Sequence, residues 1–140
     1  MPKVAGSCLC GSVRYRTEAQ PLMTAICHCD NCQRQSGSAF SIIVGVPAGS
    51  LRFEGDQHLA TFEDRGTSGK AVNRRFCRNC GSPIVSLVEI MPDVHFIKAG
   101  TLHDRSWLKP TAHFWCGTAQ PWVEIGADVS KFAKNPEARS

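Results

Sequence analysis

Apolar and polar residues alternate over short stretches of this chain, which is the pattern of half-buried β-strands. Residues 12–17 show this alternation, and residues 39–46 form a mostly apolar, β-branched run that stops at Pro47. No stretch shows the sustained period of a long amphipathic helix. Because Gly and Pro interrupt the pattern at short intervals, the sequence predicts a mainly β, antiparallel domain with few short helices.

Further strands are expected at residues 23–29, 51–54, 58–62, 70–76, 84–88, 94–98 and 112–115. Residues 30–36 are short and polar, and we expect one helical turn there with Asp30 as its N-cap and Gly37 at its end. A brief helix is expected over residues 130–134. The last residues, 135–140, are expected to form a frayed tail.

The composition fits one globular domain that spans residues 1–140. Hydrophobic residues make up 42% of the chain and charged residues 20%, a balance that excludes a disordered protein. Trp107, Trp115 and Trp122 are large apolar side chains, so we expect them in the core. No apolar run approaches the ~20 residues that a membrane helix needs, and no membrane partner is expected.

Residues 1–6 lack the apolar segment of a signal peptide, so the sequence predicts a cytoplasmic protein. Thiols stay reduced in the cytosol, and eight cysteines therefore indicate metal binding rather than disulfides. The formal net charge is +4, but seven ionised thiols and two zinc ions would reduce it to about +1. The charge therefore gives no reason to expect a nucleic-acid partner.

Seven of the eight cysteines fall in three tight clusters, and the first and last clusters predict one closed zinc site with the ligands Cys8, Cys10, Cys77 and Cys80. Each of these two pairs is followed by a glycine, which tolerates the positive φ of a tight metal-binding turn. The alternative is that these thiols are free or serve redox chemistry. Two cysteine pairs, each followed by glycine, favour a structural metal site over free or redox-active thiols.

The middle cluster leaves three cysteines, Cys27, Cys29 and Cys32, for a second zinc ion. Cys27 and Cys29 are two positions apart, so on a strand they point to one face, and Cys32 returns to it after a short turn. Three protein ligands are typical of a catalytic zinc site, whereas a fourth makes a site structural. From the residues alone both possibilities remain open, and the distant candidates for a fourth ligand are Cys116, His113, His95 and His103.

Several other residues each allow two interpretations. His28 could orient a thiolate or carry a proton, although a packed, hydrogen-bonded histidine is the more common case. Arg34 could bind the carboxylate of a substrate, or it could be a solvated surface residue. His95 and Lys98 could line a polar cleft or face solvent. Cys116 lies in an apolar stretch, where a lone cysteine is usually a small buried side chain.

Motifs along most of the chain, about residues 5–125, resemble the glutathione-dependent formaldehyde-activating enzyme (GFA) family. The motifs that carry the resemblance are Gly6-Ser7-Cys8-Leu9-Cys10-Gly11, Cys27-His28-Cys29-Asp30-Asn31-Cys32 and Phe76-Cys77-Arg78-Asn79-Cys80-Gly81-Ser82. The resemblance implies a β-tent-like fold of antiparallel sheets around a structural zinc at the first and last clusters. It implies a second zinc at Cys27, Cys29 and Cys32.

The activity that the resemblance implies is the condensation of formaldehyde with glutathione to S-hydroxymethylglutathione, in the carbon–sulfur lyase class. On this hypothesis Cys27, Cys29 and Cys32 are the catalytic residues, and the partner is a small-molecule thiol or thiol adduct such as glutathione. The alternative hypothesis is a zinc-stabilised binding module in which both metals are structural. The fourth ligand of the middle cluster distinguishes the two hypotheses.

Overall fold

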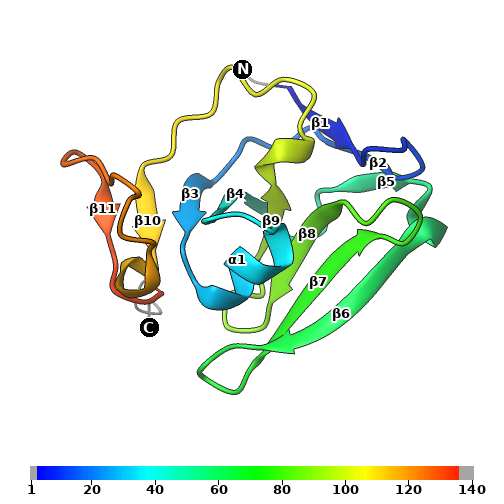
Figure 1. The fold of residues 1–140 in the computed structure, drawn as a ribbon. Helices are drawn as coiled ribbons and strands as arrows, with labels where there is room; N and C mark the ends of the chain where they lie inside the picture. Colours follow the sequence, from blue (N-terminus) through cyan, green and yellow to red (C-terminus); the bar gives the residue numbers. More distant parts are fainter. Residues whose placement is uncertain (1–2, 136–140) are drawn as a thin grey trace.

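Two β-sheets build the protein, and the computed structural model describes residues 3–135 (Figure 1). The smaller sheet has the strand order β1-β2-β5, with β1 at Val4–Ser7, β2 at Arg14–Thr17 and β5 at Arg52–Glu54. The larger sheet has the order β11-β10-β3-β4-β9-β8-β7-β6. Its strands are β3 (Met23–Cys27), β4 (Ser41–Pro47), β6 (Leu59–Arg65), β7 (Ala71–Cys77), β8 (Pro83–Val88), β9 (Val94–Lys98), β10 (Ala112–Phe114) and β11 (Ser130–Lys131).

The helical content is small, which confirms the predicted mainly β fold. One α-helix, α1 (Asp30–Ser36), occurs among residues 3–135, together with three single-turn 3₁₀ helices, η1 (Asp56–His58), η2 (Ala99–Thr101) and η3 (Cys116–Thr118). The helix α1 ends at Gly37, which adopts the left-handed conformation at φ 66°, as expected. None of the helices described in residues 3–135 is long and apolar enough to cross a membrane.

Most strand pairs are antiparallel, as the alternation predicted, but one edge of the larger sheet is not. Strand β10 pairs in parallel with both β3 and β11. The expected helix at residues 130–134 is wrong, because Ser130 and Lys131 form β11 beside Ala112 and His113. This strand has only two residues, and its conformation comes from backbone pairing with β10 rather than from a local pattern.

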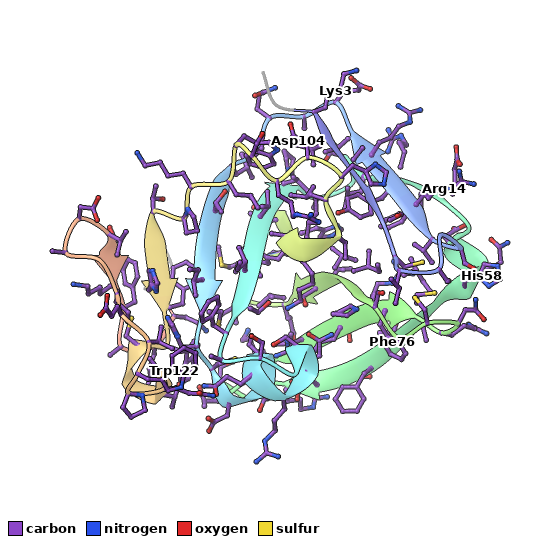
Figure 2. All side chains as sticks on the ribbon, turned by 45° about the horizontal axis from the view of Figure 1, so that its top comes forward. Lys3, Arg14, His58, Phe76, Asp104 and Trp122 are labelled. Carbon is purple, nitrogen blue, oxygen red and sulfur yellow. The ribbon has the colours of Figure 1, made fainter. Side chains whose placement is uncertain are left out.

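Three smaller expectations near the middle cluster and the C-terminus are corrected. Strand β3 ends at Cys27 rather than at residue 29, and Cys29 rather than Asp30 is the N-cap of α1. Trp122 is 70% exposed instead of buried (Figure 2). Asn135 accepts a hydrogen bond from Trp115 Nε1 at 2.8 Å, and residues 136–140 of the expected tail lie outside the described residues.

The strand register divides the larger sheet into two faces with different partners. Val44 and Val85 both pair with Ile97, so their side chains share one face. This face packs with Val4 and Tyr15 of the smaller sheet in the main hydrophobic core. The space between the two sheets is filled with side chains (Figure 2).

The opposite face of the larger sheet carries both apolar and reactive side chains. Ser86 pairs with Arg74 on one side and with Phe96 on the other, so these three side chains share this face. A second hydrophobic cluster on it includes Cys27 and Phe96. The helix α1 lies over this face, in front of β4 and β9 in the view of Figure 1. The architecture therefore brings the middle cysteine cluster to the face that is not buried against the smaller sheet.

Gly6 of β1 packs tightly against Thr101 of η2 and against Tyr15. A Cβ atom at this position would overlap the carbonyl oxygen of Thr101 and the hydroxyl of Tyr15. We expect Gly6→Ala to lower the free energy of unfolding by about 1–3 kcal/mol, the usual cost of overpacking a tight core. Urea denaturation followed by tryptophan fluorescence measures this change. Gly100→Ala is the control, because a Cβ there meets nothing within 4 Å, and equal unfolding midpoints for the two variants would contradict the expectation.

Candidate metal sites

The structure brings together the four cysteines that were predicted to form a closed site. Cys8 and Cys10 lie in the loop after β1, Cys77 ends β7, and Cys80 lies in the turn before β8. All four Sγ atoms lie within 4.8 Å of one another, so they could hold a metal ion. Cys10 and Cys77 are 67 positions apart in the chain, and their sulfurs are 3.8 Å apart. A metal at this site would therefore join the N-terminal loop to the β7–β8 connection.

The turns that hold these cysteines use the two glycines singled out in the sequence. Gly11 has φ 80° and Gly81 has φ 82°, values that residues with a Cβ rarely adopt. The turn between Cys8 and Val13 is tight enough for the Val13 N–H to donate to the Cys8 sulfur at 3.3 Å. The local backbone thus orients the sulfurs toward one centre.

Neighbouring hydroxyls favour the ionised form of two of the four thiols. Hydrogen bonding with Ser12, whose Oγ is 3.2 Å from the Cys10 sulfur, lowers the pKa of Cys10 to about 7. Hydrogen bonding with Ser82, also at 3.2 Å, lowers the pKa of Cys80 to about 5. Burial has the opposite effect at Cys77 and raises its pKa to about 11. A four-sulfur donor set with two readily formed thiolates fits a tightly bound, thiol-preferring metal ion.

The middle cluster also forms as a group. Cys27 ends β3, Cys29 caps α1, and Cys32 lies within the helix, and their three sulfurs lie within 4.8 Å of one another. The Cys32 N–H donates to the Cys29 sulfur at 3.1 Å, so the capping bond of the helix also fixes the cluster. Within residues 3–135, no fourth His, Cys, Asp or Glu atom joins this group.

Two cations that are almost completely buried lie beside this cluster. Arg74 is 5% exposed and Lys98 is 6% exposed. Arg74 Nη1 lies 3.8 Å from the Cys32 sulfur, and Lys98 Nζ donates to Ser41 Oγ at 3.1 Å. The pKa of the Cys32 thiol is held well below its usual range, first by hydrogen bonds from the other two cysteines and then by the charges of Lys98 and Arg74. The pKa of Cys27 is raised, chiefly by its hydrogen bonds with Cys29 and Cys32, and the pKa of Cys29 is also raised. Without a metal, Cys32 is therefore the sulfur of this cluster that carries negative charge most readily.

Arg74 was not identified from the sequence, and it is fixed by an ion pair. Its Nε donates to Asp64 Oδ2 at 2.9 Å, and the same oxygen accepts a hydrogen bond from Asn31 at 2.9 Å. Burial alone would raise the pKa of Asp64, but the hydrogen bonds from Arg74, from the Arg65 backbone N–H and from Asn31, together with the charge of Arg74, lower it overall. This network ties α1 to β6 and β7. No sequence motif marks Arg74, because only the register of β7 shows that it faces the cysteines.

The histidines and Cys116 do not join the group of sulfurs in the middle cluster. His28 is fully buried and its Nε2 lies 2.8 Å from Nδ1 of His113, with the two rings stacked. The Cys116 thiol donates to the His113 carbonyl oxygen at 3.4 Å. His95 is partly buried and His103 is exposed. None of these candidate fourth ligands belongs to the cluster, and the packing of His28 favours its structural role.

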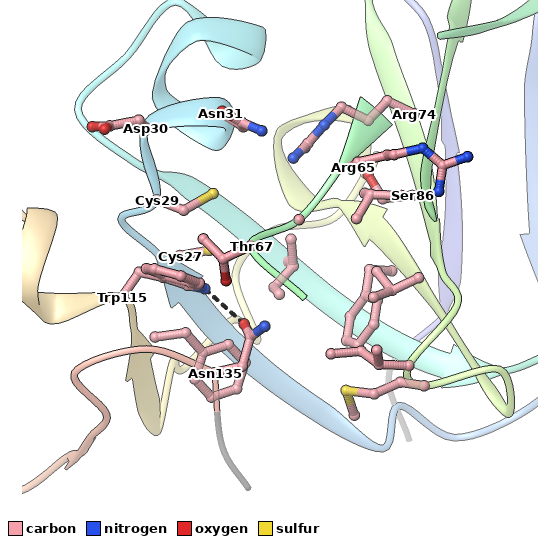
Figure 3. A pocket seen from close by; sticks show the side chains of 18 of the residues that line it. Cys27, Cys29, Asp30, Asn31, Arg65, Thr67, Arg74, Ser86, Trp115 and Asn135 are labelled. Atoms are coloured by element: carbon pink, nitrogen blue, oxygen red, sulfur yellow. Dashed lines mark hydrogen bonds between the residues drawn. The ribbon is translucent and has the colours of Figure 1, made fainter. Parts of the chain in front are cut away.

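A cavity of about 400 Å³ opens beside Cys27 and Cys29 (Figure 3). Arg74 and Ser86 of the larger sheet line it, as do Asp30 and Asn31 at the start of α1. Arg34, the predicted anchor for a carboxylate, is exposed on α1 and does not line this cavity. The remaining lining residues are Ile43, Arg65, Gly66, Thr67, Val72, Val88, Ile90, Met91, Phe96, Phe114, Trp115, Thr118 and Asn135.

A small, mainly β fold with one four-membered and one three-membered cysteine cluster defines a class of cysteine-rich domains whose clusters could hold metal ions. Residues 3–118 match the family described as "Glutathione-dependent formaldehyde-activating enzyme". The chain therefore belongs to the GFA family.

Similar proteins agree with this membership. A Halomonas elongata protein, provisionally named as a glutathione-dependent formaldehyde-activating enzyme, is 26% identical over 86% of this chain and 79% of its own length. An uncharacterised lyase of Schizosaccharomyces pombe is 24% identical over 71% of this chain and 68% of its own length. The crystal structure of a Rhodobacter sphaeroides protein has a TM-score of 0.58 at 21% identity and covers 76% of this chain and 91% of that chain. This structural likeness supports the fold.

The four-cysteine cluster should be essential for stability. A structural zinc contributes on the order of 10 kcal/mol or more of binding free energy in small modules. We expect Cys80→Ser to lower the thermal unfolding midpoint by roughly 10 °C or more, because it removes a ligand from a metal that closes a long loop. Differential scanning calorimetry measures the midpoint. Cys116→Ser is the matched control with an expected change close to zero, and an unaltered midpoint for Cys80→Ser would refute the role of this cluster.

The buried cations predict a pH effect on metal binding. Lys98 helps to lower the pKa of the Cys32 thiol, so Lys98→Met should raise that pKa. Protons would then compete with the metal at higher pH, and metal release on acidification should begin about one pH unit earlier. Release of one metal per chain during acid titration, followed with a chromogenic chelator, gives the midpoint. Lys109→Met removes an exposed lysine and should leave the midpoint unchanged; identical curves for both variants would contradict the role of Lys98.

Proposed function

We propose that the protein is a zinc-dependent carbon–sulfur lyase that acts on adducts of a thiol with an aldehyde. The proposal rests chiefly on one observation: the sulfurs of Cys27, Cys29 and Cys32 have no fourth ligand from residues 3–135, and Cys27 and Cys29 line a cavity. Three protein ligands and an accessible fourth position are typical of catalytic zinc sites. Membership of the GFA family and the lyase name of one relative support the same reaction class.

Zinc suits both clusters by its ligand preference. It binds cysteine thiolates in tetrahedral sites, closed by four ligands when the role is structural. Cys8, Cys10, Cys77 and Cys80 match this closed arrangement. Cys27, Cys29 and Cys32 leave one position for a group from outside the chain. We therefore propose a structural zinc at the first set and a catalytic zinc at the second.

The reaction joins the sulfur of a thiol to the carbonyl carbon of an aldehyde, while the thiol proton ends on the former carbonyl oxygen. The reverse direction breaks the carbon–sulfur bond and returns both molecules. Bound zinc would lower the pKa of a substrate thiol and polarise the carbonyl oxygen of the aldehyde. The chain's own contribution is to hold three thiolates together and to offset their charge with Arg74 and Lys98.

Formaldehyde and glutathione are the substrates named for the family and for the Halomonas elongata relative. For this chain we propose a small-molecule thiol as the partner, with glutathione as the first candidate to test. The predicted contact between Arg34 and a substrate carboxylate remains a prediction. An extended substrate would have to reach Arg34 outside the cavity.

The alternative function is a binding module with two structural metals. It requires a fourth protein ligand at the middle cluster, for which the sequence offered Cys116, His113, His95 and His103. The Cys116 thiol and the His113 ring are both engaged elsewhere, with the His113 carbonyl and with His28 respectively. These contacts favour the enzyme over the binding module.

A single substitution in the middle cluster tests the proposed lyase. We expect Cys29→Ser to reduce the zinc content from two ions to one per chain and the thiol–aldehyde exchange rate by at least about 100-fold, because second-site binding is lost. Metal analysis and exchange NMR of formaldehyde with glutathione measure the two effects. The fold should survive, since this cluster ties only a short stretch of chain. Cys116→Ser is the control; full turnover by Cys29→Ser would disprove the assignment.

A further inference from the structure

The inner wall of the cavity is largely apolar. Ile43, Phe96 and Phe114 are buried there, and Val72 and Val88 are partly buried beside them. They come from five different strands of the larger sheet, so the wall is part of the rigid fold. An apolar wall stabilises a ligand in proportion to the apolar surface that both remove from water. The cavity therefore favours a ligand with an apolar body.

The two cations that line the cavity are already paired within the chain. Arg74 forms its ion pair with Asp64 at 2.9 Å. Arg65 donates to the Gly69 carbonyl oxygen at 2.8 Å and lies 3.4 Å from a carboxylate oxygen of Glu63. Because both arginines are paired with carboxylates of the chain, they attract the carboxylate of a ligand less strongly.

Glutathione carries two carboxylates and one ammonium group. The one acidic residue that lines the cavity, Asp30, is exposed at the start of α1. Moving charged groups from water to an apolar wall is unfavourable unless each finds a partner. The inside of this cavity offers few such partners, so it is poorly matched to the charged ends of glutathione.

One buried hydroxyl in the cavity lacks a partner. Ser86 is 4% exposed, it lines the cavity, and its Oγ forms no hydrogen bond with the described part of the chain. Buried hydroxyls are nearly always hydrogen-bonded, so an unpaired one in a ligand cavity indicates a polar contact with the ligand. Four other buried polar atoms of residues 3–135 lack partners, and the residues that carry them do not line this cavity. Ser86 is therefore the polar group that an otherwise apolar ligand would meet.

We propose that the cavity selects a small thiol, or its aldehyde adduct, whose body is uncharged and mostly apolar and carries one hydrogen-bonding oxygen for Ser86. The thiol end of this inference rests on the function proposed above, because it places the substrate sulfur at the middle cluster. Cys29 and Ser86 lie on opposite sides of the cavity, so the two ends of one ligand would meet different groups (Figure 3). Arg74 lies beside the middle cluster and is the strand partner of Ser86. The pairing of β7 with β8 therefore fixes the position of Ser86 relative to the cysteines.

Isothermal titration calorimetry of the zinc-loaded protein with matched thiols tests the proposal. The probes are phenethyl mercaptan, its para-hydroxy analogue, its para-carboxylate analogue and glutathione. We expect the para-hydroxy thiol to bind about tenfold more tightly than the para-carboxylate thiol or glutathione, because the latter two must leave charge unpaired in the cavity. If glutathione or the para-carboxylate thiol binds as tightly as the para-hydroxy thiol, the inference is overturned while the lyase proposal stands.

Variants of Ser86 identify the polar contact. Ser86→Ala should weaken binding of the para-hydroxy thiol about fivefold and change phenethyl mercaptan by less than about twofold, since only the former has a hydroxyl to lose a partner. Ser86→Thr keeps the hydroxyl and should retain the preference. Ser50→Ala is the matched control, because the Ser50 hydroxyl is also buried and unpaired among the described residues but lies outside the cavity. Equal effects of Ser86→Ala on both thiols would remove Ser86 from the proposal.

A probe without sulfur separates this inference from the proposed function. Para-ethylphenol has the ring and the hydroxyl but no thiol. If it binds more weakly than the para-hydroxy thiol and depends on Ser86, both proposals are supported. If it binds equally tightly and still depends on Ser86, the apolar site is supported and ligation of a substrate thiol is disproved.

Discussion

The close approach of three sulfurs, two of them on buried cysteines, is the constraint on which the reactive face of this protein depends. Thiolates at this spacing repel one another, so their charge must be offset in a part of the protein that water reaches poorly. Two nearly buried cations, Arg74 and Lys98, lie beside the cluster, and Asp64 in turn holds Arg74 in place. With a divalent ion bound, the three thiolates and these three side chains would be formally neutral. Neutrality of this kind reduces the cost of burying so many charged groups together.

The two cysteine clusters have different relations to the chain. The four-cysteine cluster connects the loop after β1 to the β7–β8 connection, and thus the smaller sheet to the larger one. The middle cluster is local, because α1 supplies one sulfur and its N-cap supplies another. A metal in the first cluster acts on the whole fold, whereas a metal in the second acts on one short segment. Exchange of ligands at the middle cluster, as proposed above, would therefore leave the connection between the two sheets intact.

The two faces of the larger sheet also separate the hydrophobic core from the candidate site. One face packs against the smaller sheet in the main core, and the other presents the middle cluster, the paired cations and the apolar cavity wall. Because side chains alternate along each strand, neighbouring residues such as Val85 and Ser86 serve opposite faces. Val85 contributes to the core and Ser86 to the cavity. Along each of these strands, one set of alternate residues therefore stabilises the core, and the other set lines the cavity proposed to select the ligand.

The sequence by itself determined the mainly β class, the approximate position of most strands, the short helix that ends at Gly37, and both groups of cysteines. These features depend on local alternation, on turn residues and on ligand spacing, all of which are visible in short stretches of chain. The tertiary structure alone decided strands β1 and β11, the cap formed by Cys29, the buried positions of Arg74 and Lys98, and the cavity. Lys98 and Arg74 are charged residues on strands, and local pattern does not distinguish a solvent-facing cation from a buried one. The difference comes from strand register, which places residues from distant parts of the chain on one face and leaves their charges to compensate each other.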